Sequence, residues 1–473
     1  MTSTKPVPLS PLDPNAAEPF YRQIYDRVRA AIASGVLKPG DRIPSARALT
    51  KELGLARGTI ETAYGLLAAE GYIQARGQAG TVVTPDLKPG TAIAAPLPPP
   101  KSLAAQTSFR PDSVLPFQMG LPALDAFPRK IWARLGARAV RAMQPADMVH
   151  PPIYGIPALR AQIAAYLHLS RGITCSPAQV FVTSGYRHTI GLVAHALLNE
   201  GDSVWLENPG YPPTRDLLAL MNIAPVPVPV DGDGMVVVKA IRMAPKARAA
   251  VVTPAHQSPL CVSLSLPRRL ALLDWATRNE SWIIEDDYDG EYRYVSRPLP
   301  ALKSLDRDGR VLYAGTFSKV LLPSLRLAYL VVPQSQVERF ERVSQVSTGG
   351  SPALTQAIVT AFITEGHFAR HIQRMRKLYA ERRAATIAGL INVLGNRVRI
   401  DSPPGGMHLI LRLQGEQSDR EIVARMRDDG LYAEALSDWM INERRGDALL
   451  VNFTNVVTQS SAEALGQRIA KLL

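Results

Sequence analysis

The stretch that decides the fold is YAGTFSKVLLPSLR, residues 313–326 of the 473-residue chain. It places Lys319 among hydroxyls and small residues. A lysine of ordinary pKa, near ~10.4, is almost fully protonated at neutral pH, so it acts as a nucleophile only where its surroundings lower that pKa or a carbonyl partner captures the free amine. Pyridoxal 5'-phosphate (PLP) is such a partner, and Thr316, Ser318 and Arg326 are natural phosphate ligands. The stretch therefore predicts a PLP-binding lysine, with a solvated Ser/Lys loop as the alternative.

Length and composition predict a large cytoplasmic protein of two to four domains. The hydrophobic fraction is 46%, but the apolar runs are far shorter than the ~20 residues that span a bilayer. We expect no membrane segment, and the first 14 residues contain no apolar stretch of the secretory type.

Cysteine content and net charge indicate which kinds of site and partner the protein has. Cys175 and Cys261 are the only cysteines, too few for a disulfide framework and without zinc-ligand spacing, so we expect no metal site. The net charge of +13 favours contact with a polyanion. Residues 1–85 carry only +3 of it, so a prediction of DNA binding has to rest on pattern.

The N-terminal 85 residues alternate helix signals with turns. Apolar residues at a 3.6 period predict a helix from Phe20 to residues 34–35. Ser45 is a natural N-cap for a short second helix over residues 46–53, and a third apolar stripe ends near residue 70. A hairpin with a Gly-rich turn then covers residues 73–83. This order is typical of a winged helix-turn-helix, whose last helix enters the major groove.

Residues 19–83, PFYRQIYDRVRAAIASGVLKPGDRIPSARALTKELGLARGTIETAYGLLAAEGYIQARGQAGTVV, closely resemble the DNA-binding domain of the GntR family. The resemblance implies a double-stranded DNA operator as partner and a domain over residues 17–85. It implies that Ser45 contacts phosphate and that the other DNA contacts are Arg47, Arg57, Thr59, Arg76 and Gly77. The family often has polar residues beside the position of Arg57, whereas this chain has Ala56 and Gly58, which leaves the base preference open.

A proline-rich stretch, residues 86–112, follows without any amphipathic period. Such sequence is semi-rigid and extends ~3.1 Å per residue. We interpret it as a linker, with a loop packed on one domain as the alternative.

Residues 113–473 alternate short apolar runs with helical stripes. We expect strands at residues 180–183, 203–206, 249–253, 282–285 and 311–315, and helices at 156–169, 188–198 and 266–278. This alternation predicts an α/β domain with a mainly parallel sheet, whose ligand lies at the carboxyl ends of the strands.

Polar motifs follow these strands. Gly185 and Tyr186 lie between a strand and a helix, where backbone NH groups and the helix dipole favour an anion. Tyr211 lies at a loop tip and could stack on a planar ring. One of the acids at residues 285–287 could hold the proton of a pyridinium nitrogen, and the tyrosine after them a phenolic oxygen. Together with Lys319 they make a coherent PLP site.

The region resembles fold-type I aminotransferases, and the two halves together resemble the MocR subfamily of GntR regulators. The matching stretches are FQMGLPALDAFPRKIWARL, YGIPALRAQIAAYLHLSRGITCSPAQVFVTSGYRHTI, ENPGYP, TPAHQSP, IIEDDYDGEYRY and YAGTFSKVLLPSLRLAY. The resemblance implies an internal aldimine at Lys319, a salt bridge from Asp286 to the ring nitrogen, Tyr288 on the phenolic oxygen and Tyr211 on the ring face. The implied phosphate ligands are Gly185, Tyr186, Thr316, Ser318 and Arg326. It also implies a homodimer with its sites at the interface.

The chain departs from this pattern at two places. Leu260 and Cys261 replace a hydroxyl residue and a glycine beside the cofactor; we interpret Cys261 as a packing residue, with a reactive thiol as the alternative. Leu450 stands where aminotransferases carry the arginine that binds the substrate carboxylate. Arg412, or Arg444 and Arg445, could substitute, although we expect them at the surface.

These observations favour a PLP-dependent transcriptional regulator that senses PLP, or an amine or amino-acid effector, through Lys319. Two alternatives stay open. One is a working aminotransferase with an appended DNA-binding domain, which the loss of the arginine disfavours. The other is a DNA-binding protein whose large domain only dimerises.

Overall fold

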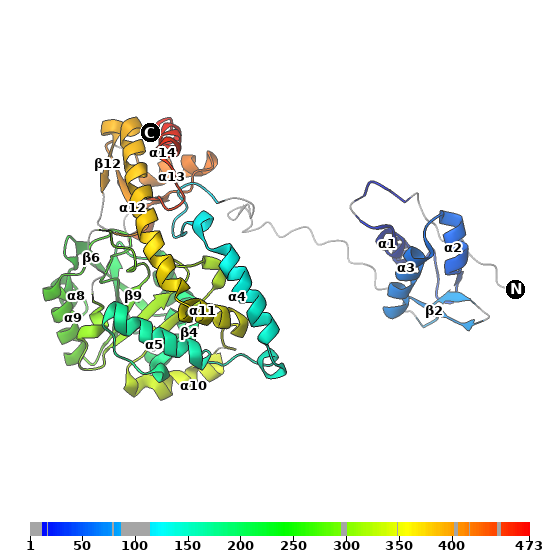
Figure 1. Ribbon diagram of the computed structural model, residues 1–473, viewed down its shortest axis with the longest axis horizontal. Helices are drawn as coiled ribbons and strands as arrows, with labels where there is room; N and C mark the ends of the chain where they lie inside the picture. Colours follow the sequence, from blue (N-terminus) through cyan, green and yellow to red (C-terminus); the bar gives the residue numbers. More distant parts are fainter. Residues whose placement is uncertain are drawn as a thin grey trace. The chain divides into compact units, whose positions relative to one another are not determined.

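The computed structural model describes residues 12–16, 18–77, 80–86, 114–294, 300–347, 349–401, 405–415, 417–441 and 446–473. The chain divides into two compact units, Met1–Pro111 and Asp112–Leu473 (Figure 1). Apart from Asp86, the linker predicted for residues 86–112 lies outside the described residues.

In its described residues, the first unit contains three helices and a small antiparallel sheet in the order β1-β3-β2. The helices are α1 (Phe20–Ala33), α2 (Ala46–Leu53) and α3 (Arg57–Ala69), and the strands are β1 (Arg42–Ile43), β2 (Ile73–Ala75) and β3 (Thr81–Val83). The predicted winged helix-turn-helix is confirmed. Sequence reasoning missed β1, because a two-residue strand is too short to show an alternating pattern.

Local capping sets the ends of α2. The Ser45 side chain accepts a hydrogen bond from the backbone NH of Ala48 at 3.2 Å, as an N-cap does. Gly54 ends the helix in the left-handed region, with φ of 64°. The buried Tyr64 hydroxyl of α3 donates to the carbonyl of Pro44 at 2.9 Å. This bond fixes the start of α2 against α3.

The second unit is built on an eight-stranded sheet in the order β4-β11-β10-β9-β8-β5-β6-β7. Its strands are β4 (Val180–Thr183), β5 (Ser203–Asn208), β6 (Ala224–Asp231), β7 (Gly234–Met235), β8 (Ala249–Val252), β9 (Trp282–Asp287), β10 (Val311–Thr316) and β11 (Ala328–Val331). The five strands from β10 to β6 pair in parallel, whereas β11 and β7 are antiparallel to their neighbours. The expected mainly parallel sheet is confirmed.

Helices cover both faces of this sheet. They are α4 (Arg129–Ala142), α5 (Pro157–Arg171), α6 (Tyr186–Leu197), α7 (Pro212–Leu220), α8 (Val237–Met243), α9 (Leu266–Arg278), α10 (Val337–Ser347) and α11 (Ala353–Thr364). Alternate residues of β10 point to opposite faces. Tyr313 packs in the core shared with α4, α5 and α11, whereas Leu312 and Ala314 pack in the core shared with α6 and α10.

The C-terminal part forms a second layer around a four-stranded antiparallel sheet in the order β12-β13-β15-β14. Its strands are β12 (Val398–Asp401), β13 (His408–Leu413), β14 (Glu434–Ala435) and β15 (Ala448–Asn452), and its helices are α12 (His367–Leu394), α13 (Asp419–Asp428) and α14 (Gln459–Ala470). Figure 1 shows the long α12 running from the helices beside the large sheet to this smaller sheet. The two parts therefore share one helix.

Candidate functional site

A cavity of about 480 Å³ lies at the carboxyl ends of the parallel strands of the large sheet. This is within the range of roughly 300–1,000 Å³ that is usual for small-molecule sites. All nine residues predicted as PLP contacts line it: Gly185, Tyr186, Tyr211, Asp286, Tyr288, Thr316, Ser318, Lys319 and Arg326. They come from the ends of four separate strands, as the parallel topology requires.

Lys319 follows the end of β10 and is half-buried in the cavity wall. Its Nζ donates to the carbonyl oxygen of Gly120 at 3.0 Å. Burial lowers the pKa of Lys319, and the carboxylates of Asp289, Glu434 and Asp286 oppose that shift. A depressed amine pKa is what a nucleophilic lysine requires.

Three consecutive acids end β9, and two of them have partners. Glu285 accepts a hydrogen bond from the backbone NH of Leu302 at 2.7 Å. Asp287 accepts from Arg171 Nε at 2.5 Å and from the hydroxyl of Tyr313 at 2.6 Å. Arg171 is 116 residues away from Asp287 in sequence, so the residues next to Asp287 in the chain give no sign of this cation. The β9 ladder pairs Asp287 with Gly315 of β10, so the strand extends beyond the predicted end at residue 285.

Asp286, between them, faces the cavity and accepts no hydrogen bond from the described residues. Burial raises the pKa of Asp286 well above its usual range, and the nearby Asp287 and Glu207 raise it further. A buried carboxylate without a partner is unfavourable by several kcal/mol in principle. The site therefore fits a cationic ring nitrogen, which would supply the missing charge.

The anion end of the cavity lies where α6 begins. Gly185 is its N-cap, with φ of 107°, a conformation that excludes most side chains. The guanidinium carbon of Arg326 lies 3.6 Å from where a Cβ on Gly185 would be. Within the described part of the chain, the Arg326 side chain has no hydrogen-bond or ion-pair partner. A helix N-terminus beside such an arginine suits a phosphate group.

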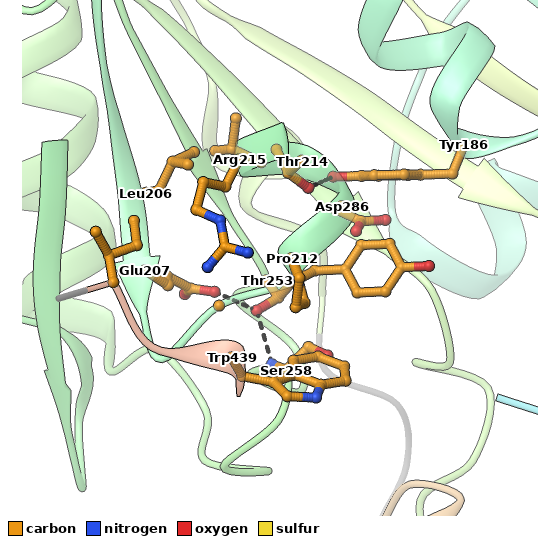
Figure 2. Close-up of a pocket in the computed structure, with 14 residues that line it drawn as sticks. Tyr186, Leu206, Glu207, Pro212, Thr214, Arg215, Thr253, Ser258, Asp286 and Trp439 are labelled. Carbon is orange, nitrogen blue, oxygen red and sulfur yellow. Dashed lines mark hydrogen bonds between the residues drawn. The ribbon is translucent and has the colours of Figure 1, made fainter. Parts of the chain in front are cut away.

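Aromatic side chains form one wall of the cavity. The Tyr186 hydroxyl lies 2.7 Å from Thr214 Oγ1, and Figure 2 marks this hydrogen bond with a dashed line. The ring of Tyr211 lies 5.6 Å from that of Trp439, tilted by 46°. The Tyr288 hydroxyl is 3.0 Å from His256 Nδ1. These contacts orient the rings that the sequence placed beside a planar ligand.

A smaller cavity of about 30 Å³ adjoins the first and shares Asp286 with it (Figure 2). Its buried Glu207 accepts a hydrogen bond from Thr253 Oγ1 at 2.5 Å. Burial raises the pKa of Glu207 to about 7. The space is about that of one water molecule, so it extends the polar surroundings of Asp286 without admitting a second ligand.

Sequence reasoning missed several residues of the large cavity. They are Met119, Gly120, Arg187, Pro212, Pro213, Ser258, Asp289, Pro323, Met407, His408, Glu434 and Trp439. Ser258 and Asp289 lie in stretches that resemble aminotransferases, and this resemblance could have indicated that they belong to the cavity. Glu434 and Trp439 come from the smaller sheet and the short helix after it, and no local pattern marks them.

The two departures from the aminotransferase pattern meet in space. Leu450 is fully buried in an apolar cluster with Ile410, Trp439 and others, and Leu260 packs against the same cluster. Arg412 does not line the cavity; its Nε pairs with Asp401 at 2.7 Å. Arg444 and Arg445 lie outside the described residues. Among the described residues, the arginines that line the cavity are Arg187 and Arg326, and neither belongs to the cluster around Leu450.

Cys261 is buried, as a packing residue would be, and adopts φ of 61° where the family has glycine. Its Sγ lies 3.3 Å from His408 Nε2. Burial raises the thiol pKa, but the charges of His408 and His256 outweigh it and lower the pKa of Cys261 to about 6. The side chain therefore contributes polar contacts as well as volume.

In the first unit, the predicted DNA contacts lie at helix starts and at the wing. Arg47 is exposed near the start of α2, Arg57 begins α3, and Thr59 lies in its first turn. Arg76 and Gly77 are exposed in the β2–β3 loop, where Gly77 has φ of 49°. Arg57 Nε pairs with Glu61 at 2.7 Å, an exposed pair that is easily exchanged for another anion.

The described residues contain no group of three or more His, Cys, Asp or Glu side chains placed to hold a metal ion. No helix in the described ranges is long and apolar enough to cross a membrane.

Comparisons with known proteins agree with both halves of the structure. Residues 20–83 match the family of bacterial regulatory proteins of the gntR type, and residues 123–445 match aminotransferase class I and II. The chain is 36% identical to the probable rhizopine catabolism regulatory protein MocR of Rhizobium meliloti, over 96% of this chain and 94% of that one. It is 32% identical to the pyridoxine biosynthesis transcriptional regulator PdxR of Corynebacterium glutamicum, over 93% and 92%.

Solved structures resemble the larger unit. An archaeal alanine:glyoxylate aminotransferase superposes with a TM-score of 0.70 and 26% identity, covering 76% of this chain and 91% of that one. The α-aminoadipate aminotransferase LysN of Thermus thermophilus, solved with N-(5'-phosphopyridoxyl)-L-leucine, gives 0.69 and 26%, covering 76% and 92%. With a winged helix-turn-helix of the GntR type joined to a fold-type I aminotransferase domain, the chain belongs to the MocR-type family of GntR regulators.

Proposed function

We propose that this protein is a PLP-dependent transcriptional regulator whose larger unit is the sensor. The domains are residues 17–85 for DNA binding, 86–112 as linker and 113–473 for the effector. The winged helix binds a double-stranded operator, and the large cavity binds PLP at Lys319. The effector is PLP itself or a small amine.

The observation that carries the proposal is the set of unpaired groups facing one cavity. Among the described residues, Asp286 is a buried carboxylate without a hydrogen-bond partner and Arg326 a guanidinium without one, and Lys319 is an amine whose pKa burial lowers. PLP would complement all three through its ring nitrogen, its phosphate and its aldehyde. When bound, it supplies an electrophilic carbon and an electron sink.

Each residue then has a defined part in holding the cofactor. Asp286 keeps the proton on the ring nitrogen, and Tyr288 donates to the phenolic oxygen. Tyr211 packs on the ring. Gly185 and Tyr186 present backbone NH groups to the phosphate, with Thr316, Ser318 and Arg326 completing its shell.

A working aminotransferase is the second candidate, and the likeness to aminotransferase structures favours it. Such an enzyme needs a bidentate cation for the substrate carboxylate. The buried Leu450 supplies none. A regulatory function therefore explains more of the chain than an aminotransferase function does, since it also explains the winged helix-turn-helix.

We further propose that the protein is a cytoplasmic homodimer. Two winged helices would then read two half-sites, because the symmetry of an operator mirrors that of a dimer. Binding of an effector would change the relative affinity of two arrangements of the dimer for DNA.

Absorbance and DNA binding together test this function. PLP-loaded protein should absorb near roughly 420 nm, and Lys319→Ala should lose that band. In gel shifts with DNA from upstream of its own gene, the wild-type protein should bind specifically, and PLP should change its affinity. Absence of specific binding both with and without PLP contradicts the proposal, as does steady turnover of an amino donor and a 2-oxo acid.

A further inference from the structure

An apolar cluster around Leu450 backs one wall of the cavity. Leu450 on β15 has no exposed surface, and its cluster includes Trp439 and, at its edge, Met119. Trp439 and Met119 also line the cavity. A ligand carboxylate placed against Trp439 and Met119 would lose its hydration and meet no arginine there, which is unfavourable.

Glu434 lies directly across from Leu450. The antiparallel strands β14 and β15 pair Glu434 with Leu450, and residues paired in this way project from the same face of a sheet. Glu434 lines the cavity. The chain therefore presents a carboxylate beside the position where an aminotransferase presents a guanidinium, and the local charge is reversed.

One oxygen of Glu434 is already engaged and the other is available. Oε2 accepts a hydrogen bond from Trp439 Nε1 at 2.9 Å, which fixes the carboxylate. Oε1 has no hydrogen-bond partner among the described residues. Burial raises the pKa of Glu434, while Trp439 and the charge of Lys319 oppose that shift. A donor on the ligand would stabilise this carboxylate further.

The arginines of the cavity do not offset this acid. Arg326 lies beside Gly185, and Arg187 belongs to the first turn of α6, where the phosphate of PLP is proposed to bind. Both cations lie at the α6 end of the cavity, whereas Glu434 comes from β14. A second anion on the effector would then meet Glu434 and the apolar wall.

We propose that the effector is a small primary amine that lacks a carboxylate and binds Glu434 through a second donor group, an ammonium or a hydroxyl. This inference rests on the proposed function, in which the first amine meets PLP at Lys319. It concerns the far end of the ligand, where no bond forms or breaks. Glu434 is thus the specificity-determining residue of the site.

Four ligands with the same four-carbon chain test the proposal: putrescine, 4-amino-1-butanol, n-butylamine and 4-aminobutyrate. Their affinities for PLP-loaded protein are measured by calorimetry at one pH and one salt concentration. We expect putrescine and the amino alcohol to bind roughly tenfold or more tightly than n-butylamine, because hydrogen bonds to a charged group are strong. We expect 4-aminobutyrate to bind most weakly. Equal or tighter binding of 4-aminobutyrate overturns the proposal.

Glu434→Gln tests whether the charge of this residue determines the selectivity. Glutamine removes the negative charge, but its side-chain oxygen can still accept the hydrogen bond from Trp439. The variant should lose the preference for putrescine over n-butylamine, whereas Glu338→Gln, which removes an exposed carboxylate of α10, should keep it. An unchanged ratio in Glu434→Gln overturns the assignment.

Affinities are compared only after PLP loading has been measured for each variant. Failure of the wild-type protein to take up PLP would contradict the proposed function. Uptake of PLP without selectivity would contradict this inference alone.

Discussion

The amine of Lys319 donates a hydrogen bond to the backbone carbonyl of Gly120, which lies 199 residues earlier in the chain. Gly120 has φ of +75°, and a Cβ at this position would lie 2.2 Å from Nζ. The glycine thus gives Lys319 both an acceptor and the space to reach it. Lys319 is held toward the cavity by a segment outside the motif that predicts it.

Gly120→Ala should therefore displace Lys319 and reduce PLP uptake about tenfold or more. The methyl group would overlap the amine, and the backbone conformation would be strained by roughly 1 kcal/mol. The measurement is the absorbance near roughly 420 nm during a PLP titration. Gly201→Ala is the matched control, because Gly201 has φ of +84° and no atom within 4 Å of the added methyl. If both variants take up PLP equally, the contact does not position Lys319.

Elements whose signals are local could be predicted from the sequence. Helix α2 follows from Ser45 and Gly54, which mark its two ends within ten residues. Helix α9 coincides with the predicted residues 266–278, since its apolar stripe lies within one segment. The residues around Lys319 were found in the same way, because strand, turn and polar side chains follow one another directly.

Contacts between distant segments could not be predicted. Arg171 pairs with Asp287 only because α5 packs on the sheet. Glu434 reaches the cavity from a segment that carries no motif. Gly120 lies in a stretch that resembles aminotransferases, but nothing in that stretch indicates its contact with Lys319. Burial and pairing at these positions depend on how the helices and sheets pack together, and no local sequence pattern indicates that packing.

Asp286→Asn and Asp287→Asn should have opposite effects on the PLP-free protein at neutral pH. Asp286 is buried and has no hydrogen-bond partner in the described ranges, so its neutral replacement should stabilise the larger unit by about 1–2 kcal/mol. Asp287 is paired with Arg171, and breaking a buried ion pair costs about 3–5 kcal/mol. Thermal unfolding followed by circular dichroism measures both. Equal changes of Tm in the two variants would contradict the assignment of Asp286 as the unpaired acid.

The effect of Asp286→Asn should depend on pH in a defined direction. The folded-state pKa of Asp286 is raised, so the folded protein binds a proton that the unfolded chain releases above a pKa near ~3.9. This contribution to stability is present at low pH and is lost as pH rises through the folded pKa. The gain from asparagine should therefore be larger at pH 8 than at pH 4.5, and the reverse trend would contradict the raised pKa.

Arg57→Ala should weaken operator binding about tenfold, since a single good arginine contact to a base contributes roughly 1–3 kcal/mol. Arg22→Ala is the control, because Arg22 is also exposed and also pairs with an acid four residues on, Asp26, at 3.2 Å. Fluorescence anisotropy with a labelled operator, repeated over a range of salt concentrations, measures both. Equal losses in the two variants would show that net charge, and not the position at the start of α3, determines binding.

Leu450→Arg should couple energetically to Glu434. Arginine in the apolar cluster should destabilise the larger unit by several kcal/mol, because a buried charge is unfavourable. Glu434, its cross-strand neighbour, should offset part of that loss. In a double-mutant cycle, Glu434→Gln should therefore lower the free energy of unfolding by about 1–3 kcal/mol more in the Leu450→Arg background than in the wild type.

Leu450→Met is the control. It conserves volume, should lower the free energy of unfolding by less than about 1.5 kcal/mol, and should show no coupling to Glu434. Additive effects in the arginine background would mean that the side chains at 434 and 450 do not meet, and with that the charge reversal at the cavity wall would lose its structural basis.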